Sequence, residues 1–439
     1  MAAESDARPA DRPKLLYVCF ERLRPSTAAA THVHEICRGL EKRGFSVSLI
    51  AEEAGPAPGW TERCCRYARV LRRGLRLAAR NDILFVRAHF AALPLALFAR
   101  LIGIPTAHEV NGLYEDAFIT HPRLAPFRHW LSWMQRLQYR WSDALVAVTP
   151  DLVAWARRQA GHDKVFLVSN AANTTIFNPD GPSLGRERRF VVFFGGLVRW
   201  HGIEIMLEAV RCRAWPSEVE LLLIGPVVDE SLRPVLDRLP RGASYLGQVA
   251  QSELPPLIRG AIAALVPILD PAGRSSQGVM PLKMFEALAC GTPVIASDLP
   301  GQADFVRANR CGIVVPVGDS ARLAEAVAEL AADPARAARL GRSGAKTVLA
   351  GHSWEARSAE LADILRRTLD ALARAKADLP LRPPWYLTLR GCLVIAAAGV
   401  AVGLALRLAR PVQPPEPGLL ARIETWKALA AELQRNHRR

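Results

Sequence analysis

Short apolar runs alternate with longer stretches of helical, amphipathic spacing along most of the chain. The first half contains six runs that we expect to be strands, at 14–20, 45–50, 82–86, 105–110, 144–148 and 165–168. Stretches with helical spacing separate them, including 27–43, 122–141 and 151–160. Strands that alternate with helices are typical of a parallel sheet covered on both faces. The pattern therefore predicts an α/β domain.

The alternation stops at the sequence N-P-D-G-P over 178–182, which predicts a linker. It then resumes, with further strands expected at 190–194, 220–224, 264–267, 293–296 and 312–315. We predict two doubly wound domains, 14–180 and 181–353, after an unstructured segment 1–13. In such sheets ligands bind at the carboxyl ends of the strands.

The C-terminal part of the chain has a different pattern. Residues 354–384 form an expected crossover helix and linker, and 391–406 contain no charged residue. Because about 20 residues are needed to span a bilayer, we predict a transmembrane helix over 385–410 and a basic helical tail over 411–439. A buried helical hairpin is the alternative.

The charge balance is basic, with 57 Lys and Arg against 42 Asp and Glu, or +15. Such a balance suits nucleic acid, anionic lipid or phosphorylated substrates. The chain has no nucleic-acid-binding motif, so we expect no nucleic-acid partner and favour membrane and phosphate. Arginines recur at helical spacing over 63–80, which predicts either a helix on anionic lipid or a solvated face. The eight cysteines show no metal-binding spacing, and we expect no metal.

The segment 273–301 reads as loop, helix, tight turn and buried strand. Its helix is expected to begin at Pro281, and Gly291 ends it. The helix N-terminus, the loop amides and Lys283 suit a phosphate, while Glu286 can accept hydrogen bonds from sugar hydroxyls. This combination favours a nucleotide diphosphate. The binding residues expected in this segment are Ser276, Gly278, Pro281, Leu282, Lys283 and Glu286.

This segment resembles the donor-binding segment of family 4 glycosyltransferases of the GT-B fold. In that family an E-x7-E motif precedes A-C-G-x-P-V-I-A-S, and Glu286 matches the second Glu, which holds the ribose. Gly278 stands in the place of the first Glu. The sequence P-L-K-M-F-E identifies the chain with a subgroup that has P-L-K-x-F-E.

A second anion cradle is expected where the strand 190–194 runs into Gly195 and Gly196. The string F-F-G-G-L-V-R-W-H-G-I-E resembles the family's first phosphate-binding loop in its W-H-G form. Gly196 and His201 replace the family's usual Arg and Lys. We expect the cationic role either to pass to Arg199, His201 and Lys283 or to be weaker in this chain. A capping or packing role is the alternative for His201.

The string H-E-V-N-G follows the strand 105–110 and resembles the H-E-x-N-G segment of related transferases. The resemblance implies that His108 contacts the transferred sugar. Glu109 and Asn111 are expected to contact the sugar or the acceptor.

The resemblance implies a GT-B architecture and transfer of sugar from a nucleotide-diphosphate sugar with retention of configuration. His108, Lys283 and Glu286 are the expected catalytic residues, and the amides of Gly195 and Gly196 would stabilise the leaving diphosphate. The family requires neither a metal, another cofactor nor a protein nucleophile. The predicted membrane helix favours a lipid-linked or cell-surface glycan acceptor in bacterial polysaccharide or glycolipid biosynthesis, with catalysis at the cytoplasmic face of the inner membrane.

Two alternatives stay open. A nucleotide-sugar epimerase shares the GT-B architecture and would act without an acceptor. A catalytically silent, membrane-anchored scaffold would explain why the chain lacks three of the family's usual charged residues.

Overall fold

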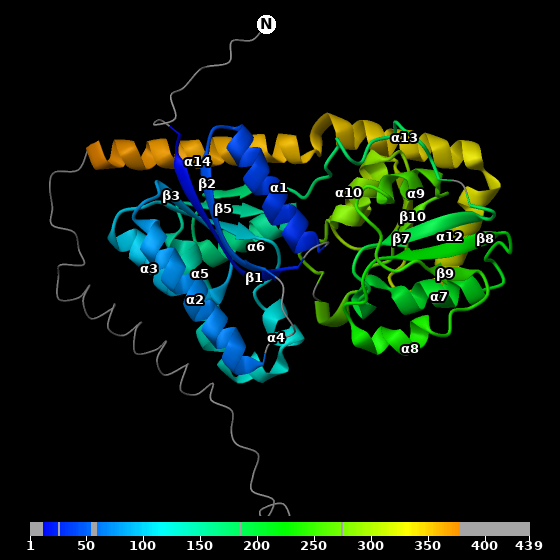
Figure 1. Ribbon diagram of the computed structural model, residues 1–439, viewed down its shortest axis with the longest axis horizontal. Helices are drawn as coiled ribbons and strands as arrows, with labels where there is room; N and C mark the ends of the chain where they lie inside the picture. The colour runs from blue at the N-terminus through cyan, green and yellow to red at the C-terminus, as the bar shows by residue number, and fades with distance from the viewer. Residues whose placement is uncertain (1–11, 25–26, 54–58, 185, 274, 378–439) are drawn as a thin grey trace, which may run out of the picture. The chain divides into compact units, whose positions relative to one another are not determined.

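The computed structural model describes residues 12–24, 27–53, 59–184, 186–273 and 275–377 (Figure 1). The predicted transmembrane helix 385–410, the tail 411–439 and most of the N-terminal segment 1–13 lie outside the described residues. Within the described ranges no helix combines the length and the apolar character that a membrane crossing requires.

The first sheet contains six parallel strands in the order β2-β1-β3-β4-β5-β6. Its strands are β1 Lys14–Leu23, β2 Ser46–Glu53, β3 Ile83–Arg87, β4 Thr106–Val110, β5 Ala144–Ala147 and β6 Val165–Leu167. The connecting helices are α1 Ala28–Lys42, α2 Trp60–Ala78, α3 Leu93–Leu101, α4 Asp116–Thr120, α5 Arg128–Trp141 and α6 Pro150–Ala160. Every residue of β3, β4 and β5 is buried, as expected of parallel strands covered on both faces.

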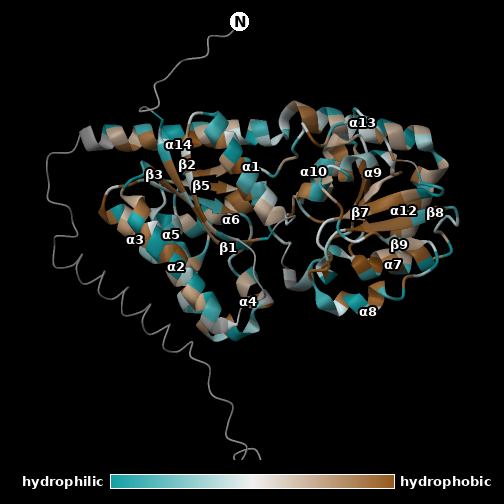
Figure 2. Cartoon of the chain, in the orientation of Figure 1, coloured by the Kyte–Doolittle hydropathy of each residue, from teal (hydrophilic) through white to brown (hydrophobic). Residues whose placement is uncertain are grey.

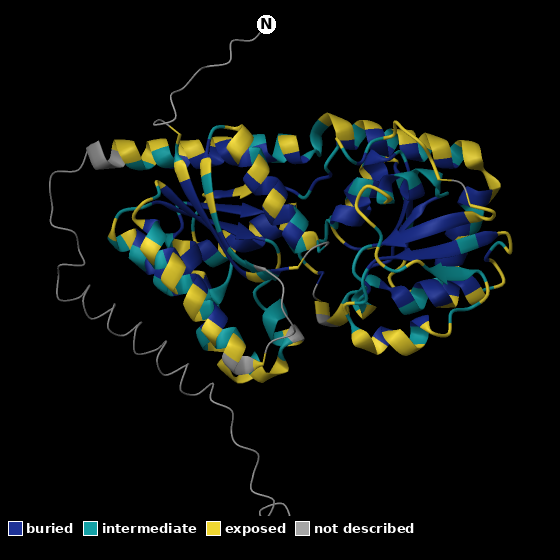
Figure 3. Cartoon of the chain, in the orientation of Figure 1, coloured by how far each residue is buried: buried dark blue, intermediate teal, exposed yellow. Residues whose placement is uncertain are grey.

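The second sheet is also parallel, in the order β12-β11-β10-β7-β8-β9. Its strands are β7 Arg189–Phe194, β8 Val219–Ile224, β9 Ala243–Tyr245, β10 Ala264–Val266, β11 Val294–Ser297 and β12 Gly312–Val315. The helices are α7 Ile203–Arg211, α8 Arg233–Leu236, α9 Leu254–Gly260, α10 Leu282–Ala289, α11 Gln302–Asn309, α12 Ser320–Ala332 and α13 Pro334–Gly351. Strands β7 and β8 are hydrophobic (Figure 2) and almost wholly buried (Figure 3).

The last helix, α14 Trp354–Ala377, packs against the first sheet although it follows the second in sequence. Leu361 and Leu365 share a hydrophobic cluster with residues of β1 and α1. The chain passes from the first sheet to the second after β6 and returns before α14, and these two segments are bonded to each other at Ala172. The Ala172 N–H donates to the His352 oxygen at 3.0 Å, and the Ala172 oxygen accepts from the Trp354 N–H at 3.0 Å. These paired backbone bonds fix the start of α14.

The two parallel sheets confirm the two predicted α/β domains, whereas the predicted C-terminal hydrophobic helix lies outside the described residues. Within the two domains the structure differs from the prediction in local detail. The helix expected over 122–141 begins with a 3₁₀ segment, Pro122–Phe127, because Pro126 interrupts the α-helical bonding. Pro281 precedes α10 as its N-cap, with extended backbone, instead of being its first helical residue. Strand β9 was not predicted, since its three half-exposed residues form no apolar run.

Candidate functional site

The loop after β7 contains two glycines whose lack of a side chain shapes the site. Gly195 has a φ of 116°, and a Cβ placed on it would lie 3.4 Å from the Lys283 Cε. Gly202 has a φ of 75°, and its Cβ would meet the Pro267 oxygen at 2.1 Å. Both positions favour glycine because of left-handed backbone and close approach. The loop therefore passes close to the first turn of α10.

Lys283 lies against this loop and is only 8% exposed. Its Nζ is 3.9 Å from the centroid of the Phe193 ring and 3.5 Å from the His201 Nδ1. The His201 Nδ1 is 2.7 Å from the Gly196 oxygen. Since a carbonyl oxygen only accepts, this Nδ1 carries the hydrogen and cannot accept one from Lys283.

Among the residues that the structure describes, no carboxylate lies within ion-pair distance of the Lys283 ammonium either. Burial lowers its pKa to about 7, and the carboxylate of Glu286 compensates only in part. A buried cation is costly unless an anion pairs with it. Together with the N-terminus of α10 and the glycine loop, it forms a site suited to a phosphate.

Glu286 lies one helical turn after Lys283 and is partly exposed. Burial raises its pKa to about 7, Lys283 opposes this rise, and the nearby Glu35 carboxylate adds to it. A carboxyl group that titrates near neutrality can donate and accept hydrogen bonds, as recognition of a sugar diol requires.

Glu109 lies at the end of β4 and is 4% exposed. Its carboxylate accepts hydrogen bonds from the Tyr17 hydroxyl and the His32 Nε2, and the Arg87 Nη1 is 3.4 Å away. Burial alone would raise its pKa, but the charges of His32 and Arg87 outweigh burial and hold it at about 2. Glu109 is thus an ionised, well-satisfied anchor for the residues around it.

The same histidine connects the first sheet to the loop before α10. The His32 Nδ1 is 3.0 Å from the Asn170 Oδ1, and the Asn170 Nδ2 donates to the Met280 oxygen at 2.7 Å. Because this amide nitrogen faces a carbonyl, its oxygen faces His32, and both ring nitrogens of His32 therefore donate. Sequence reasoning assigned no role at the site to the side chains of His32 and Asn170. His32 could have been found from its place in the chain. It lies in the first turns of the helix that follows β1, and the start of such a helix lies at the carboxyl end of the sheet, where ligands bind.

His108 does not occupy the predicted place. It is fully buried, its Nδ1 lies 3.1 Å from the Ser142 Oγ, and burial lowers its pKa to about 4. Successive side chains of a strand point to opposite faces, so His108 faces the interior beside Tyr139 while Glu109 faces His32. The structure therefore does not bring His108 to an external sugar. Asn111, just after β4, has a buried amide nitrogen that finds no hydrogen-bond partner among the described residues, and it stays a candidate contact.

Other predicted donor residues lie around the loops. Arg199 is exposed and forms an ion pair with Glu204, with Nη2 and Oε1 2.6 Å apart. Ser276 is exposed. Leu282 contributes its side chain to the hydrophobic cluster of the first sheet, so only its backbone can face a ligand. Among the described residues no three His, Cys, Asp or Glu side chains are grouped to hold a metal.

Gly278, which replaces the family's first Glu, has a φ of 84°. A Cβ there would lie 3.3 Å from the Thr149 Cβ, and the Thr149 hydroxyl donates to the Gln277 oxygen at 2.6 Å. The left-handed backbone and this contact explain why the position holds glycine in this chain.

Two family profiles match consecutive parts of the chain. The one described as "Glycosyltransferase Family 4" matches residues 29–176, and the one described as "Glycosyl transferases group 1" matches residues 188–333. Together they cover most of both sheets.

Three known proteins illustrate the similarity. The alpha-maltose-1-phosphate synthase of Mycolicibacterium smegmatis is 28% identical over 57% of this chain and 72% of its own length. The GDP-mannose-dependent alpha-(1-6)-phosphatidylinositol monomannoside mannosyltransferase of Mycobacterium tuberculosis is 33% identical over 41% of this chain and 48% of its own length. The solved sucrose-phosphate synthase of Thermosynechococcus elongatus superposes with a TM-score of 0.67 and 20% identity, covering 82% of this chain and 100% of that one. The chain belongs to the group 1/family 4 glycosyltransferases of the GT-B fold, enzymes that take a sugar from a nucleotide sugar.

Proposed function

We propose that this protein is a retaining glycosyltransferase that moves a sugar from a nucleotide-diphosphate sugar to a lipid-linked or cell-surface glycan. The observation that carries the proposal is the buried Lys283 ammonium, which lies beside Gly195 at the N-terminus of α10 without a carboxylate partner within ion-pair distance among the described residues. The name of the mannosyltransferase relative, "GDP-mannose-dependent", supports a nucleotide donor.

In the proposed reaction the bond between the anomeric carbon and the diphosphate oxygen breaks as the acceptor hydroxyl oxygen bonds to that carbon. Attack from the face that the diphosphate leaves retains the configuration. Negative charge grows on the diphosphate, where Lys283, the N-terminus of α10 and the Gly196 N–H stabilise it. The Gly195 N–H, which the sequence predicted for this role, already donates to the Ile224 oxygen at 3.0 Å. The acceptor proton passes to the leaving oxygen. Glu286 holds the nucleotide ribose and orients the donor.

Exposed arginines on and just after α2 favour a membrane-bound acceptor. They are Arg69, Arg72, Arg73, Arg76 and Arg80. Each such residue near an anionic surface contributes about 1 kcal/mol of attraction. The mannosyltransferase relative is named for a phosphatidylinositol acceptor. We place the protein at the cytoplasmic face of the inner membrane, attached through residues 385–410, which lie outside the described part.

Release of nucleoside diphosphate from a panel of UDP- and GDP-sugars, with and without lipid extract, tests the function. One donor should give lipid-dependent release, with loss of release in Glu286→Gln and Lys283→Met. The exposed Lys164→Met is the matched control and should keep full activity. NMR of the product assigns the anomeric configuration.

Other outcomes refute parts of the proposal. Interconversion of two donor sugars without acceptor would identify an epimerase. Absence of both release and donor binding would identify a silent scaffold. An inverted anomeric centre would exclude the retaining reaction. Recovery of the full chain in the soluble fraction, equal to that of a chain ending at Ala377, would remove the membrane attachment.

A further inference from the structure

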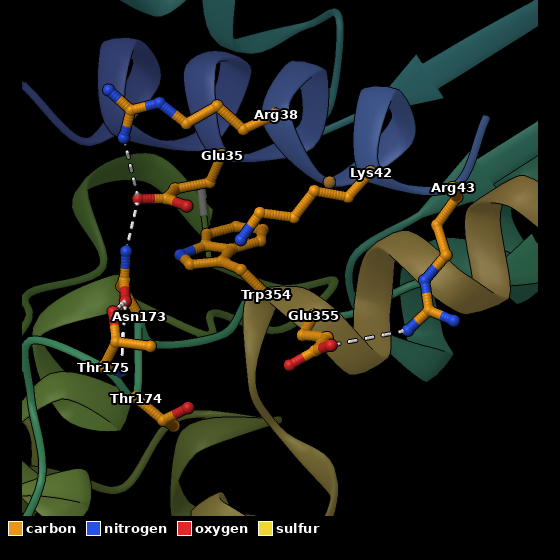
Figure 4. A pocket seen from close by; sticks show the side chains of 10 residues that line it. Glu35, Arg38, Lys42, Arg43, Asn173, Thr174, Thr175, Trp354 and Glu355 are labelled. Carbon is orange, nitrogen blue, oxygen red and sulfur yellow. Dashed lines mark hydrogen bonds and ion pairs between the residues drawn. The ribbon is translucent and has the colours of Figure 1, made fainter. Parts of the chain in front are cut away.

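A cavity of about 170 Å³ lies where α1, the residues 173–175 and the start of α14 meet (Figure 4). It shares no residue with the loop of Gly195 or with Lys283. A single water needs only about 10–15 Å³ of cavity volume, so the cavity has room for several waters. It can hold the core of a small polar ligand.

The mouth of the cavity is basic. Arg38 and Lys42 extend from α1, and Arg43 follows the helix (Figure 4). Arg38 makes only a loose pair with Glu35 at 3.7 Å, and Arg43 one with Glu355 at 3.8 Å. Lys42 has no carboxylate partner within the described ranges. Three cations thus face two carboxylates, which leaves a net positive charge for an anion.

The inner wall carries hydrogen-bonding groups. Trp354 is 4% exposed, and its indole N–H, on the side of Glu35 in Figure 4, has no hydrogen-bond partner among the described residues. Glu35 accepts one hydrogen bond from the Asn173 Nδ2 at 2.9 Å and keeps further acceptor capacity. Trp354 lines the cavity, so its N–H can donate to a ligand there. The wall thus offers a donor at Trp354 and an acceptor at Glu35, which suits a hydroxyl group.

We propose that this cavity binds a small phosphorylated sugar or polyol, with the phosphate at Arg38, Lys42 and Arg43 and the hydroxyls at Glu35 and Trp354. An anion without hydroxyl groups would be repelled by the Glu35 carboxylate and could not donate a hydrogen bond to it. A neutral sugar would leave the three cations unused. A phosphate monoester that carries hydroxyls satisfies both ends of the cavity.

The site is connected to the donor side of the protein through two of its residues. The Trp354 ring packs edge-on against the His32 ring, with centroids 4.9 Å apart, and His32 is linked through Asn170 to Met280, just before α10. Glu35 is near enough to Glu286 to help raise its pKa. Occupation of the cavity is therefore expected to change affinity at the donor site, which makes the ligand an effector.

Calorimetric titration of the full chain tests the binding site independently of any transferase activity. The probes are glucose 6-phosphate, glycerol 3-phosphate, inorganic phosphate and glucose. The titrations use the Lys283→Met background, so that phosphate binding at the donor site does not contribute. We expect saturable binding of the two phosphorylated polyols, at least tenfold tighter than that of inorganic phosphate or glucose.

Variants locate the binding. Lys42→Met should weaken it at least tenfold, and Trp354→Phe, which keeps the ring and removes the N–H, about fivefold. Arg367→Met, an exposed arginine on α14, is the matched control and should change nothing. Absence of saturable binding, or binding that Lys42→Met leaves unchanged, would overturn the proposal. So would binding seen only with anionic phospholipid vesicles, which would identify a lipid headgroup as the ligand.

The effector role has its own measurement. In the wild-type chain, a saturating phosphorylated polyol should change the Kd of UDP or GDP by at least fivefold, within the usual range of coupling between sites. Lys42→Met should remove this change, whereas competition at the donor phosphate site would survive the substitution. An unchanged Kd, with binding at the cavity established, would overturn the effector role. Failure of the proposed transferase reaction would affect neither measurement.

Discussion

Binding of a nucleoside diphosphate should depend on pH through Lys283. In the free protein burial lowers the pKa of this lysine to about 7. A diphosphate beside its Nζ favours the charged form and raises that pKa. Binding is therefore strongest below pH 7 and weakens as the pH rises, because the lysine must first take up a proton. From pH 7 to pH 9 the charged fraction falls from about one half to about 1%, which raises Kd about fiftyfold, or about 2.3 kcal/mol.

Calorimetry of UDP and GDP binding measures the proton directly. At pH 8 about nine tenths of Lys283 is neutral, so binding should take up about 0.9 proton, seen as a dependence of the enthalpy on buffer ionisation. Phosphate groups with a second pKa near 6 are already ionised at this pH. The pKa of Glu286 is also about 7, so this carboxyl is about nine tenths ionised at pH 8 and can release about 0.1 proton at most. Any uptake by Glu286 would persist in Lys283→Met and is separated in that way. Lys283→Met should abolish the uptake, whereas Lys164→Met should keep it.

Two results would refute this reasoning. Binding without proton uptake at pH 8 would mean that Lys283 is already charged in the free protein or does not contact the phosphate. A Kd that is constant between pH 7 and pH 9 in the wild-type chain, and equal in Lys283→Met, would remove the lysine from the donor site.

Three further substitutions test the backbone of the site. Gly278→Glu restores the family's carboxylate at a φ of 84°, so it should cost about 1–3 kcal/mol in thermal unfolding without tightening nucleotide binding. Gly202→Ala places a Cβ 2.1 Å from a backbone oxygen and should cost more than Gly161→Ala, which has a similar φ but open space around it. Asn170→Ala leaves the Met280 oxygen without its donor, which should destabilise the protein by about 1–3 kcal/mol and raise the KM for the donor in steady-state assays.

The sheets could be predicted because their strands are continuous apolar runs, and burial on both faces requires such runs. The placement of Lys283 and Glu286 one turn apart on one helix could be predicted, because an apolar helical pattern contains both and a glycine follows it. The hydrogen bonds between distant segments could not be predicted from the sequence. Asn170 is 138 residues from His32, and Glu109 is 77 residues from it. Only the folded sheet brings these residues together.

The orientation of β4 shows a second limit of the sequence. His108 and Glu109 are neighbours near the carboxyl end of β4, so the sequence places both at the edge of the sheet where ligands bind. Side chains alternate between faces with a period of two, but in a strand buried on both faces the apolar pattern does not reveal which face is which. The family motif directs attention to the histidine, while the structure places the carboxylate toward the polar network.

The surroundings of Glu109 also bear on the chemistry of transfer. A general base must accept a proton near the working pH, and it must have a free acceptor position for the attacking hydroxyl. Hydrogen bonds from Tyr17 and His32, with Arg87 close by, occupy this carboxylate, and the charges of His32 and Arg87 hold its pKa at about 2 against the effect of burial. It therefore stays ionised and occupied across neutral pH and takes no proton from an acceptor. Its contribution is positional, since it holds His32, which holds Asn170 and the loop before α10. With Glu109 occupied, the proposed reaction delivers the acceptor proton to the departing diphosphate oxygen.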